Sequence, residues 1–371
     1  MQKNDNRDKD KEHLRKYKLN LKKKERARKR RIKTTLFLTV LAAVAVVVSV
    51  VLFSFAGGRT STMADEAQSG AESGANGESD INNETEAFTS QNNSNRTKTI
   101  LQDMAYPYRS ASYKEMKDIT SDFAAVLDVE KNEFIAGKAD SAKMYPASMT
   151  KVMTLLTAND FISSPDKVYE FTLEASDYCY VSGASLAGLL VGEKVSVKDL
   201  YYGLILPSGG DAALGIAAAT TDNGDFKYFA DLMNLEALMM GLKNTHFTNP
   251  VGLHDENNYS TACDIAVLLN YAMQNVDAAP VLSAERYFMS TPSMHENGIG
   301  LYSLVYKYFY RYNINNVKLL GGKTGYTTEA RSCMVVEVEK NGKKYIVCTA
   351  HAPSQSDMME DHRKIYDNYC I

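Results

Sequence analysis

Three short motifs combine residue types that together support nucleophilic catalysis: Ser-Met-Thr-Lys at 148–151, Ser-Gly-Gly at 208–210 and Lys-Thr-Gly at 323–325. A serine hydroxyl is a poor nucleophile at neutral pH unless a base accepts its proton. On a helix that begins near Ser148, the amine of Lys151 lies one turn further along the same face. The first motif therefore predicts a nucleophile beside its proton acceptor.

The electrostatic surroundings decide whether Lys151 can act as a base. A lysine amine is neutral near pH 7 only if it is buried or lies close to another positive charge, and Lys323 could supply that charge. The helix N-terminus and the Ser148 backbone N–H favour negative charge where an oxyanion would form. The sequence thus predicts a nucleophile, a base and an oxyanion donor in one place.

The Lys-Thr-Gly motif is expected to close a strand beside the nucleophile. Gly325 permits close backbone approach by a ligand, Thr324 offers a hydroxyl and Lys323 a cation, a set that suits a substrate with a terminal carboxylate. Each motif alone has a simpler explanation, an exposed helix start or a glycine-rich turn. Their occurrence in this order makes the signal specific.

The elements that must position these motifs alternate between strands and helices. The pattern predicts an α/β (α+β) domain, with an antiparallel sheet assembled from both ends of the domain and a helical region inserted between them. Turns at Lys131-Asn132 and at 340–342 join two of the predicted strand pairs. The predicted strands are 123–129, 133–138, 318–324, 332–339 and 344–351, and the predicted helices are 148–161, 208–220, 225–240, 261–275 and 356–369.

The N-terminal part has the composition of a membrane anchor. Residues 1–33 carry sixteen Lys or Arg against five Asp or Glu, in a chain whose net charge is −3. Residues 34–57 have no ionisable side chain and as a helix cover roughly 30 to 35 Å, enough to cross a bilayer's hydrocarbon core. The basic block predicts that 1–33 lies in the cytoplasm and the rest outside. A cleaved signal peptide is the alternative, disfavoured because the apolar run is long and no clear A-x-A site follows.

Residues 58–112 are rich in Ser, Gly, Asn, Glu and Thr, a composition that is typical of disordered segments. As a tether of about fifty residues they would span roughly 40 Å. Residues 113–371 are then predicted to form one globular domain. The sequence therefore predicts a single-pass membrane protein whose domain lies on the extracytoplasmic side.

Several other classes of function are disfavoured. Five cysteines at scattered spacing form no recognisable disulfide framework, so buried free thiols are favoured over a single bridge. No C-x-x-C or H-E-x-x-H motif occurs, and His246 and His254 are expected to hydrogen-bond within a loop rather than to bind zinc. A basic arm beside an apolar segment favours anionic lipid over nucleic acid. We predict no metal, no cofactor and no nucleic-acid partner.

Five longer stretches carry a resemblance to a known family. They are Tyr-Pro-Ala-Ser-Met-Thr-Lys at 145–151, Leu-Pro-Ser-Gly-Gly-Asp-Ala-Ala at 206–213, Thr-His-Phe-Thr-Asn-Pro-Val-Gly-Leu at 245–253, Tyr-Ser-Thr-Ala at 259–262 and Gly-Lys-Thr-Gly-Tyr-Thr at 322–327. Over roughly residues 120–352 the chain resembles the D-alanyl-D-alanine carboxypeptidases, the low-molecular-mass penicillin-binding proteins of peptidase family S11. The set S-x-x-K, S-D-N and K-T-G is typical of penicillin-binding enzymes.

The resemblance implies a β-lactamase/transpeptidase-like fold and a role in peptidoglycan biosynthesis and cell shape. The implied reaction removes the terminal D-alanine from stem pentapeptides of the cell wall through an acyl-enzyme on Ser148. The same resemblance assigns Lys151 as the proton acceptor and Ser208 as a relay of protons between the two lysines.

The resemblance also implies how substrate is held. Lys323 and Thr324 would bind the substrate carboxylate, and the Tyr326 backbone N–H would be the second oxyanion donor. β-Lactams would acylate the same serine as inhibitors, and no cofactor is implied. The implied substrate-binding residues are Lys323, Thr324, Gly325, Tyr326 and Gly210.

Gly210 departs from the family pattern, which usually has asparagine at this position. The loss of one side-chain hydrogen bond costs about 1 to 3 kcal/mol, or roughly 5- to 150-fold in activity. Two other functions therefore stay open: a catalytically weak or silent penicillin- or peptidoglycan-binding domain, and a serine β-lactamase. A β-lactamase needs a carboxylate that activates the deacylating water, and Glu170 and Glu174 lie in a loop region without an E-x-x-x-N pattern.

Overall fold

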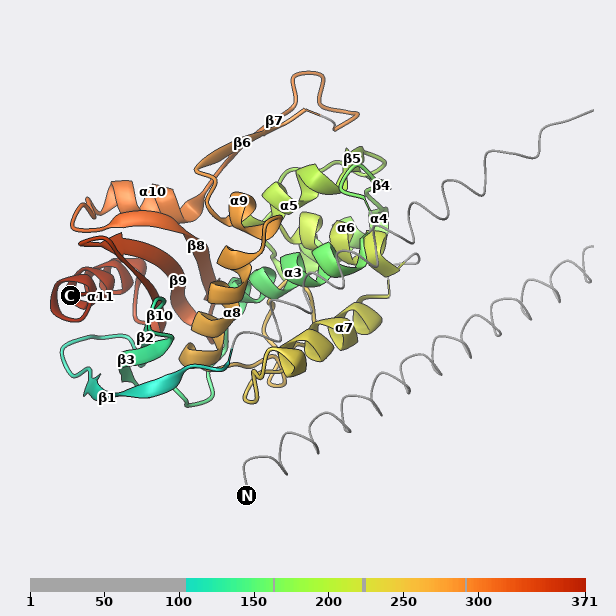
Figure 1. Cartoon of the computed structure of the whole chain (residues 1–371). Helices are drawn as coiled ribbons and strands as arrows, with labels where there is room; N and C mark the ends of the chain where they lie inside the picture. The colour runs from blue at the N-terminus through green and yellow to red at the C-terminus, as the bar shows by residue number, and fades with distance from the viewer. Residues whose placement is uncertain (1–104, 163, 222–224, 291) are drawn as a thin grey trace, which may run out of the picture. The chain divides into compact units, whose positions relative to one another are not determined.

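The computed structural model describes residues 105–371, except 163, 222–224 and 291 (Figure 1). The predicted basic arm, the predicted membrane helix and most of the predicted tether lie outside these residues. Within the described part of the chain, no helix is both long and apolar enough to cross a membrane.

A six-stranded sheet forms one part of the domain, in the order β1-β3-β2-β10-β9-β8 (Figure 1). Because β2 pairs with β10, strands from both ends of the domain meet in one sheet, as the sequence predicts. The strands are β1 Tyr108–Glu115, β2 Phe123–Asp128, β3 Glu133–Lys138, β8 Lys318–Thr327, β9 Arg331–Lys340 and β10 Lys343–Ala352.

The edge strand β1 departs from the expected pattern in two ways. It pairs with β3 in parallel, whereas the other neighbours in this sheet are antiparallel. It also takes in the last residues of the segment predicted as a tether, residues 108–112. Most of its side chains are exposed and none is buried, so no alternation of apolar and polar residues marks it in the sequence.

Each face of the sheet is covered by helices, and successive residues of a strand point to opposite faces. In β9, Cys333 and Val335 pack with the helical region, whereas Met334 and Val336 pack with the other apolar cluster. That second cluster contains residues of α10 Leu304–Arg311 and α11 Gln355–Asn368. The long apolar runs of β9 and β10 therefore reflect burial on both faces.

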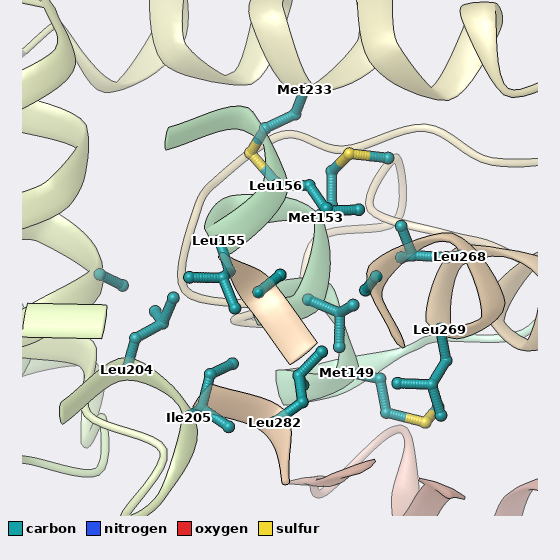
Figure 2. Close-up of a cluster of buried hydrophobic side chains, with 14 of the residues drawn as sticks. Met149, Met153, Leu155, Leu156, Leu204, Ile205, Met233, Leu268, Leu269 and Leu282 are labelled. Atoms are coloured by element: carbon teal, nitrogen blue, oxygen red, sulfur yellow. The ribbon is translucent and has the colours of Figure 1, made fainter. Parts of the chain in front are cut away.

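The helical region inserted between β3 and β8 is organised around α3, whose residues from Lys151 to Asn159 are all buried. Figure 2 shows Met153, Leu155 and Leu156 of α3 among apolar side chains from neighbouring helices. The elements of this region are η1 Ala147–Thr150, α3 Lys151–Phe161, β4 Val168–Glu170, α4 Leu173–Ser182, β5 Lys194–Ser196, α5 Val197–Ile205, α6 Gly210–Thr221, α7 Phe226–Met239, α8 Ala262–Gln274, α9 Ala278–Leu282, β6 Arg286–Met289 and β7 Ile299–Tyr302.

Two helix starts differ from the prediction, and both concern the motifs. The helix predicted from Ser148 begins as a 3₁₀ turn, η1, and becomes α-helical only at Lys151. The helix predicted from Ser208 begins at Gly210, because Ser208 has a φ of 66°, outside the helical range.

The cysteines and one of the loop histidines agree with the prediction. All five cysteines are free and buried. His246 Nδ1 lies 2.7 Å from the Asn257 carbonyl oxygen, so this histidine is a loop hydrogen-bonder. The turn between β9 and β10 has positive φ at both Asn341 and Gly342, as expected for a tight hairpin.

Candidate active site

The predicted nucleophile and base lie in direct contact where η1 passes into α3. Lys151 Nζ donates to Ser148 Oγ at 2.9 Å and to the Val251 carbonyl at 2.6 Å. Burial lowers the pKa of Lys151 to about 7, against an opposing attraction from the Asp211 carboxylate. A large part of the Lys151 population is therefore neutral near pH 7 and can accept a proton from Ser148.

The second lysine makes a parallel contact with the second serine. Lys323 Nζ donates to Ser208 Oγ at 2.8 Å and to the Thr324 carbonyl at 2.9 Å. Burial, and then the nearby Lys151 ammonium, lower the pKa of Lys323 well below its ordinary value. Burial is thus the largest cause for both lysines, and the repulsion between the two amines, which the sequence predicts, is the second cause at Lys323.

Ser208 is held in an unusual backbone conformation. Its φ of 66° is in the left-handed region, which is uncommon for residues other than glycine. The next residue, Gly209, donates its N–H to the Gly203 carbonyl at 2.9 Å. This sharp turn before α6 directs the Ser208 hydroxyl toward Lys323 rather than along the helix.

Gly325 allows the strand β8 to pack directly against η1. A Cβ atom at this position would lie 2.9 Å from the Pro146 carbonyl oxygen and 3.2 Å from the Ser148 nitrogen. The sequence predicts that this glycine admits a ligand backbone, but the closest groups to it belong to the protein. Gly325 therefore brings the Lys-Thr-Gly strand against the nucleophile.

A loop that the sequence analysis did not assign to the site supports Lys151 from the other side. Asn249 Oδ1 accepts the backbone N–H groups of Val251, Gly252 and Leu253 at 3.2, 2.8 and 3.1 Å. Gly252 has a φ of 79°, and a Cβ atom there would lie 2.1 Å from the Ala147 carbonyl oxygen. The loop therefore presses closely on η1 and presents the Val251 carbonyl to Lys151.

Gly210 lies in a packed position and does not line the cavity of the site. A Cβ atom on Gly210 would lie 2.8 Å from Ala184 Cβ and 3.3 Å from Val251 Cγ1. Its N–H donates to the Ser185 carbonyl at 2.6 Å. The predicted contact of position 210 with substrate is thus not supported by its surroundings, because the loop after α4 occupies the space beside it.

The site opens into a cavity of about 570 Å³. Ser148, Ser208 and Thr324 line it, while Lys151 and Lys323 are buried and do not. None of the lining residues is acidic. The lining residues are Ser148, Gly183, Ser185, Ser208, Leu304, Tyr308, Thr324, Gly325, Tyr326, Ser332, Cys333, Pro353, Ser354, Gln355 and Met358.

The structure therefore brings together most of the predicted site residues, with Gly210 behind the wall rather than on it. It adds contributions that the sequence analysis missed, from α10, the start of α11 and the loop after α4. Two signals marked the loop beneath Lys151: the Asn-Pro-Val-Gly sequence at 249–252 has the composition of a turn, and it lies within one of the stretches that resemble the family.

The fold and the two serine–lysine pairs define a serine hydrolase site. The chain belongs to the D-alanyl-D-alanine carboxypeptidase family, peptidase family S11, whose model matches residues 110–354. This result confirms the resemblance that the motifs indicated.

Individual relatives agree with this assignment. The chain is 28% identical over 249 residues to the D-alanyl-D-alanine carboxypeptidase DacF of Bacillus subtilis, which covers 66% of this chain and 60% of DacF. It is 32% identical over 226 residues to a D-alanyl-D-alanine carboxypeptidase of Streptomyces sp. strain K15, covering 56% of this chain and 73% of the relative. The chain thus spans less than two thirds of the length of DacF.

The fold also matches solved structures of the family. The crystal structure of the Streptomyces K15 DD-transpeptidase is 28% identical, with a TM-score of 0.60 over 68% of this chain and 97% of that chain. The expected β-lactamase/transpeptidase-like fold is therefore supported at the level of the whole catalytic domain.

Proposed function

We propose that this protein is a serine-type D-alanyl-D-alanine carboxypeptidase that removes the terminal D-alanine from peptidoglycan stem peptides. The observation that carries the proposal is the pair of contacts Lys151–Ser148 and Lys323–Ser208, with both serine hydroxyls on one cavity. Family membership and the names of the relatives support the same reaction.

The first step forms an acyl-enzyme on Ser148. Ser148 Oγ attacks the carbonyl carbon of the penultimate D-alanine while its proton passes to neutral Lys151 Nζ. The backbone N–H groups of Ser148 and Tyr326 stabilise the oxyanion. The C–N bond to the terminal D-alanine then breaks, and the leaving amine takes a proton that Ser208 relays from the lysines.

The second step hydrolyses this ester. Water attacks the acyl carbon and gives a proton to Lys151, and the bond to Ser148 breaks as the serine regains its proton. Lys151 is suited to both steps because its pKa of about 7 lets it accept and return a proton near neutral pH.

Substrate recognition follows from the cavity wall. Thr324 lines the cavity, whereas Lys323 is 1% exposed and lies behind the wall, where it contacts Ser208. We assign the terminal carboxylate to Thr324 and to Lys323 beneath it, because the negative charge of a bound carboxylate favours the protonated form of this lysine. β-Lactams would acylate Ser148 in the same way.

We propose that this reaction takes place on the outer side of a membrane. The support is the sequence: the basic segment 1–33, the apolar segment 34–57 and the polar segment 58–112. A single N-terminal anchor with a tether would let the domain reach peptidoglycan outside the cytoplasm.

The two other functions have less support. A serine β-lactamase that uses a carboxylate for deacylation is disfavoured because no acidic residue lines the cavity. Glu170 ends β4, and Glu174 lies in the first turn of α4. A silent binding domain was suggested by Gly210, but both serine–lysine contacts are complete without a side chain at 210.

A direct test compares D-alanine release with penicillin labelling on the full-length protein. We expect release of D-alanine from a D-alanyl-D-alanine peptide and stable labelling by a fluorescent penicillin. Rapid turnover of penicillin would support the β-lactamase instead, and labelling without release would support the binding domain. A Ser148→Ala variant that still releases D-alanine would rule out the proposed mechanism.

A further inference from the structure

The loop between α4 and β5, residues 183–193, covers one side of the cavity and is fixed at several points. It begins at Gly183, the left-handed cap of α4, and the Ala184 N–H donates to the Cys179 carbonyl at 3.0 Å. Near its other end, Glu193 Oε2 accepts the Leu190 N–H at 2.9 Å. Hydrogen bonds therefore hold the backbone of this loop in a defined conformation.

The centre of the loop is folded around one buried carboxylate. Asp211, which is fully buried, accepts the backbone N–H groups of Ala187, Gly188 and Leu189 at 2.7, 3.0 and 3.1 Å. Charged acceptors make stronger hydrogen bonds than neutral ones. Because Asp211 directly follows Gly210, the carboxylate ties the loop to the start of α6, beside Ser208.

Ser185 is the residue that this arrangement presents to the cavity. Its carbonyl accepts the Gly210 N–H at 2.6 Å, which fixes its backbone, while its side chain is exposed and lines the same cavity as Ser148 and Ser208. Within the described part of the chain, its hydroxyl makes no hydrogen bond to another protein group. A hydroxyl that extends from a fixed backbone and has no protein partner is available to a ligand.

We propose that Ser185 is a substrate-binding residue whose hydroxyl hydrogen-bonds to the amide on the acyl side of the scissile bond. This inference rests on the proposed function. Thr324 is assigned to the carboxylate of the leaving D-alanine, and Ser185 lines the same cavity from a different segment of the chain, so we assign Ser185 to the acyl half. A hydroxyl both donates and accepts, which matches an amide. The loop thereby supplies the polar contact that Gly210 does not have.

The experiment compares two β-lactams on the full-length protein. Benzylpenicillin carries an acylamino group where the substrate has this amide, whereas 6-aminopenicillanic acid has a free amine there. We expect Ser185→Ala to slow acylation by benzylpenicillin about 10-fold and to leave acylation by 6-aminopenicillanic acid within about twofold, since one hydrogen bond is lost. Ser185→Thr keeps the hydroxyl and should retain most of the rate.

Ser182→Ala is the matched control, because its hydroxyl donates to the Tyr178 carbonyl at 2.6 Å and does not line the cavity. We expect this control to acylate at the wild-type rate, and Ser185→Ala to unfold at the wild-type temperature. Equal effects of Ser185→Ala on both β-lactams, or none, would overturn the inference while leaving the proposed function intact. A wild-type protein that neither compound acylates would overturn both.

Discussion

Two regions of the site are built in different ways. The motif wall, formed by η1, α3 and β8, presents reactive side chains, with the buried Lys151 and Lys323 behind two serines. The loop wall is formed by residues 183–193, beside the cavity, and by residues 248–253, which contact η1 and Lys151; it holds its shape through hydrogen bonds of backbone N–H groups. The difference shows that the reaction depends on the identity of the side chains in the motif wall and on the backbone conformation in the loop wall.

The same hydrogen-bonding arrangement fixes the loop wall at two places. Asp211 gathers the N–H groups of three consecutive residues, and Asn249 does the same for the loop that contacts Lys151. Each is a short side chain whose oxygen can accept several backbone donors at once. Substitutions on the motif wall should therefore change the chemistry, whereas substitutions of the residues that fix the loop wall should change stability and rate together.

The largest effect is expected from Lys151→Met, which keeps an apolar side chain of similar length but removes the base. Loss of general base catalysis should slow acylation by penicillin about 10³-fold. Because the pKa of Lys151 in the wild-type protein is about 7, its neutral fraction increases as the pH is raised through 7. Acylation should therefore be faster above pH 7 and slower below pH 7.

The pH profile is the control for this first prediction. Acylation rates from pH 5 to 9 should lose their inflection near pH 7 in Lys151→Met, while thermal unfolding stays cooperative. An inflection that persists in the variant would assign the base to another group.

The next effect concerns a pair of glycines with matched conformations. Gly252 and Gly342 have φ values of 79° and 78°, but a Cβ atom on Gly252 meets the Ala147 carbonyl, whereas Gly342 has nothing within 4 Å. Gly342→Ala should cost only conformational strain, about 1 kcal/mol of unfolding free energy. Gly252→Ala adds overpacking against η1 and should cost about 3 kcal/mol.

Chemical denaturation of both variants measures the difference, and penicillin acylation shows whether the nucleophile has moved. We expect Gly342→Ala to acylate at the wild-type rate and Gly252→Ala to be slower. Equal loss of stability in the two variants would mean that the loop at 248–253 shifts to accommodate the added methyl group and does not fix the position of η1.

A smaller effect is expected at Asn249. Replacement by alanine removes the acceptor of three N–H groups and should lower the unfolding free energy by about 2 kcal/mol. The Val251 carbonyl would no longer be fixed against Lys151, so acylation should slow about 10-fold. Asn249→Asp keeps oxygens that can accept the N–H groups and should lose less stability and less acylation rate than Asn249→Ala. A wild-type acylation rate in Asn249→Ala would contradict this positioning role.

The difference between the motif wall and the loop wall also explains which parts of the site could be predicted from the sequence. Ser148, Lys151, Ser208 and Thr324 were found because their chemistry requires particular residue types in a particular order. The central strands were found because their apolar runs are buried. The part played by Asn249 was not predicted, because it binds backbone N–H groups that every residue except proline has.

Two of the elements that were missed, β1 and α4, lack a periodic signal for similar physical reasons. The edge strand β1 is largely exposed, and α4 has only two buried residues, Ala175 and Cys179. Neither element needs a continuous apolar face, because each is held partly by hydrogen bonds and by its neighbours. The position of Gly210 behind the wall, rather than on it, depends on the loop after α4 and could not be read from the motif alone.

The smallest effect, and the sharpest comparison of the two walls, comes from restoring the family's asparagine. A side chain at 210 would begin 2.8 Å from Ala184 Cβ, so Gly210→Asn should displace the loop wall and cost about 1 to 2 kcal/mol in unfolding free energy. Acylation by benzylpenicillin should fall rather than rise, because Ser185 moves with the loop.

The double variant Gly210→Asn with Ala184→Gly tests the cause of this loss. Removing the Ala184 methyl group opens the space that the asparagine needs, so part of the lost stability and rate should return, measured by thermal unfolding and benzylpenicillin acylation. If Gly210→Asn alone raised the rate without loss of stability, position 210 would have room for a side chain and the loop would not occupy it. If the double variant recovered nothing, the cost would arise from the start of α6 instead, where Gly210 is the first helical residue.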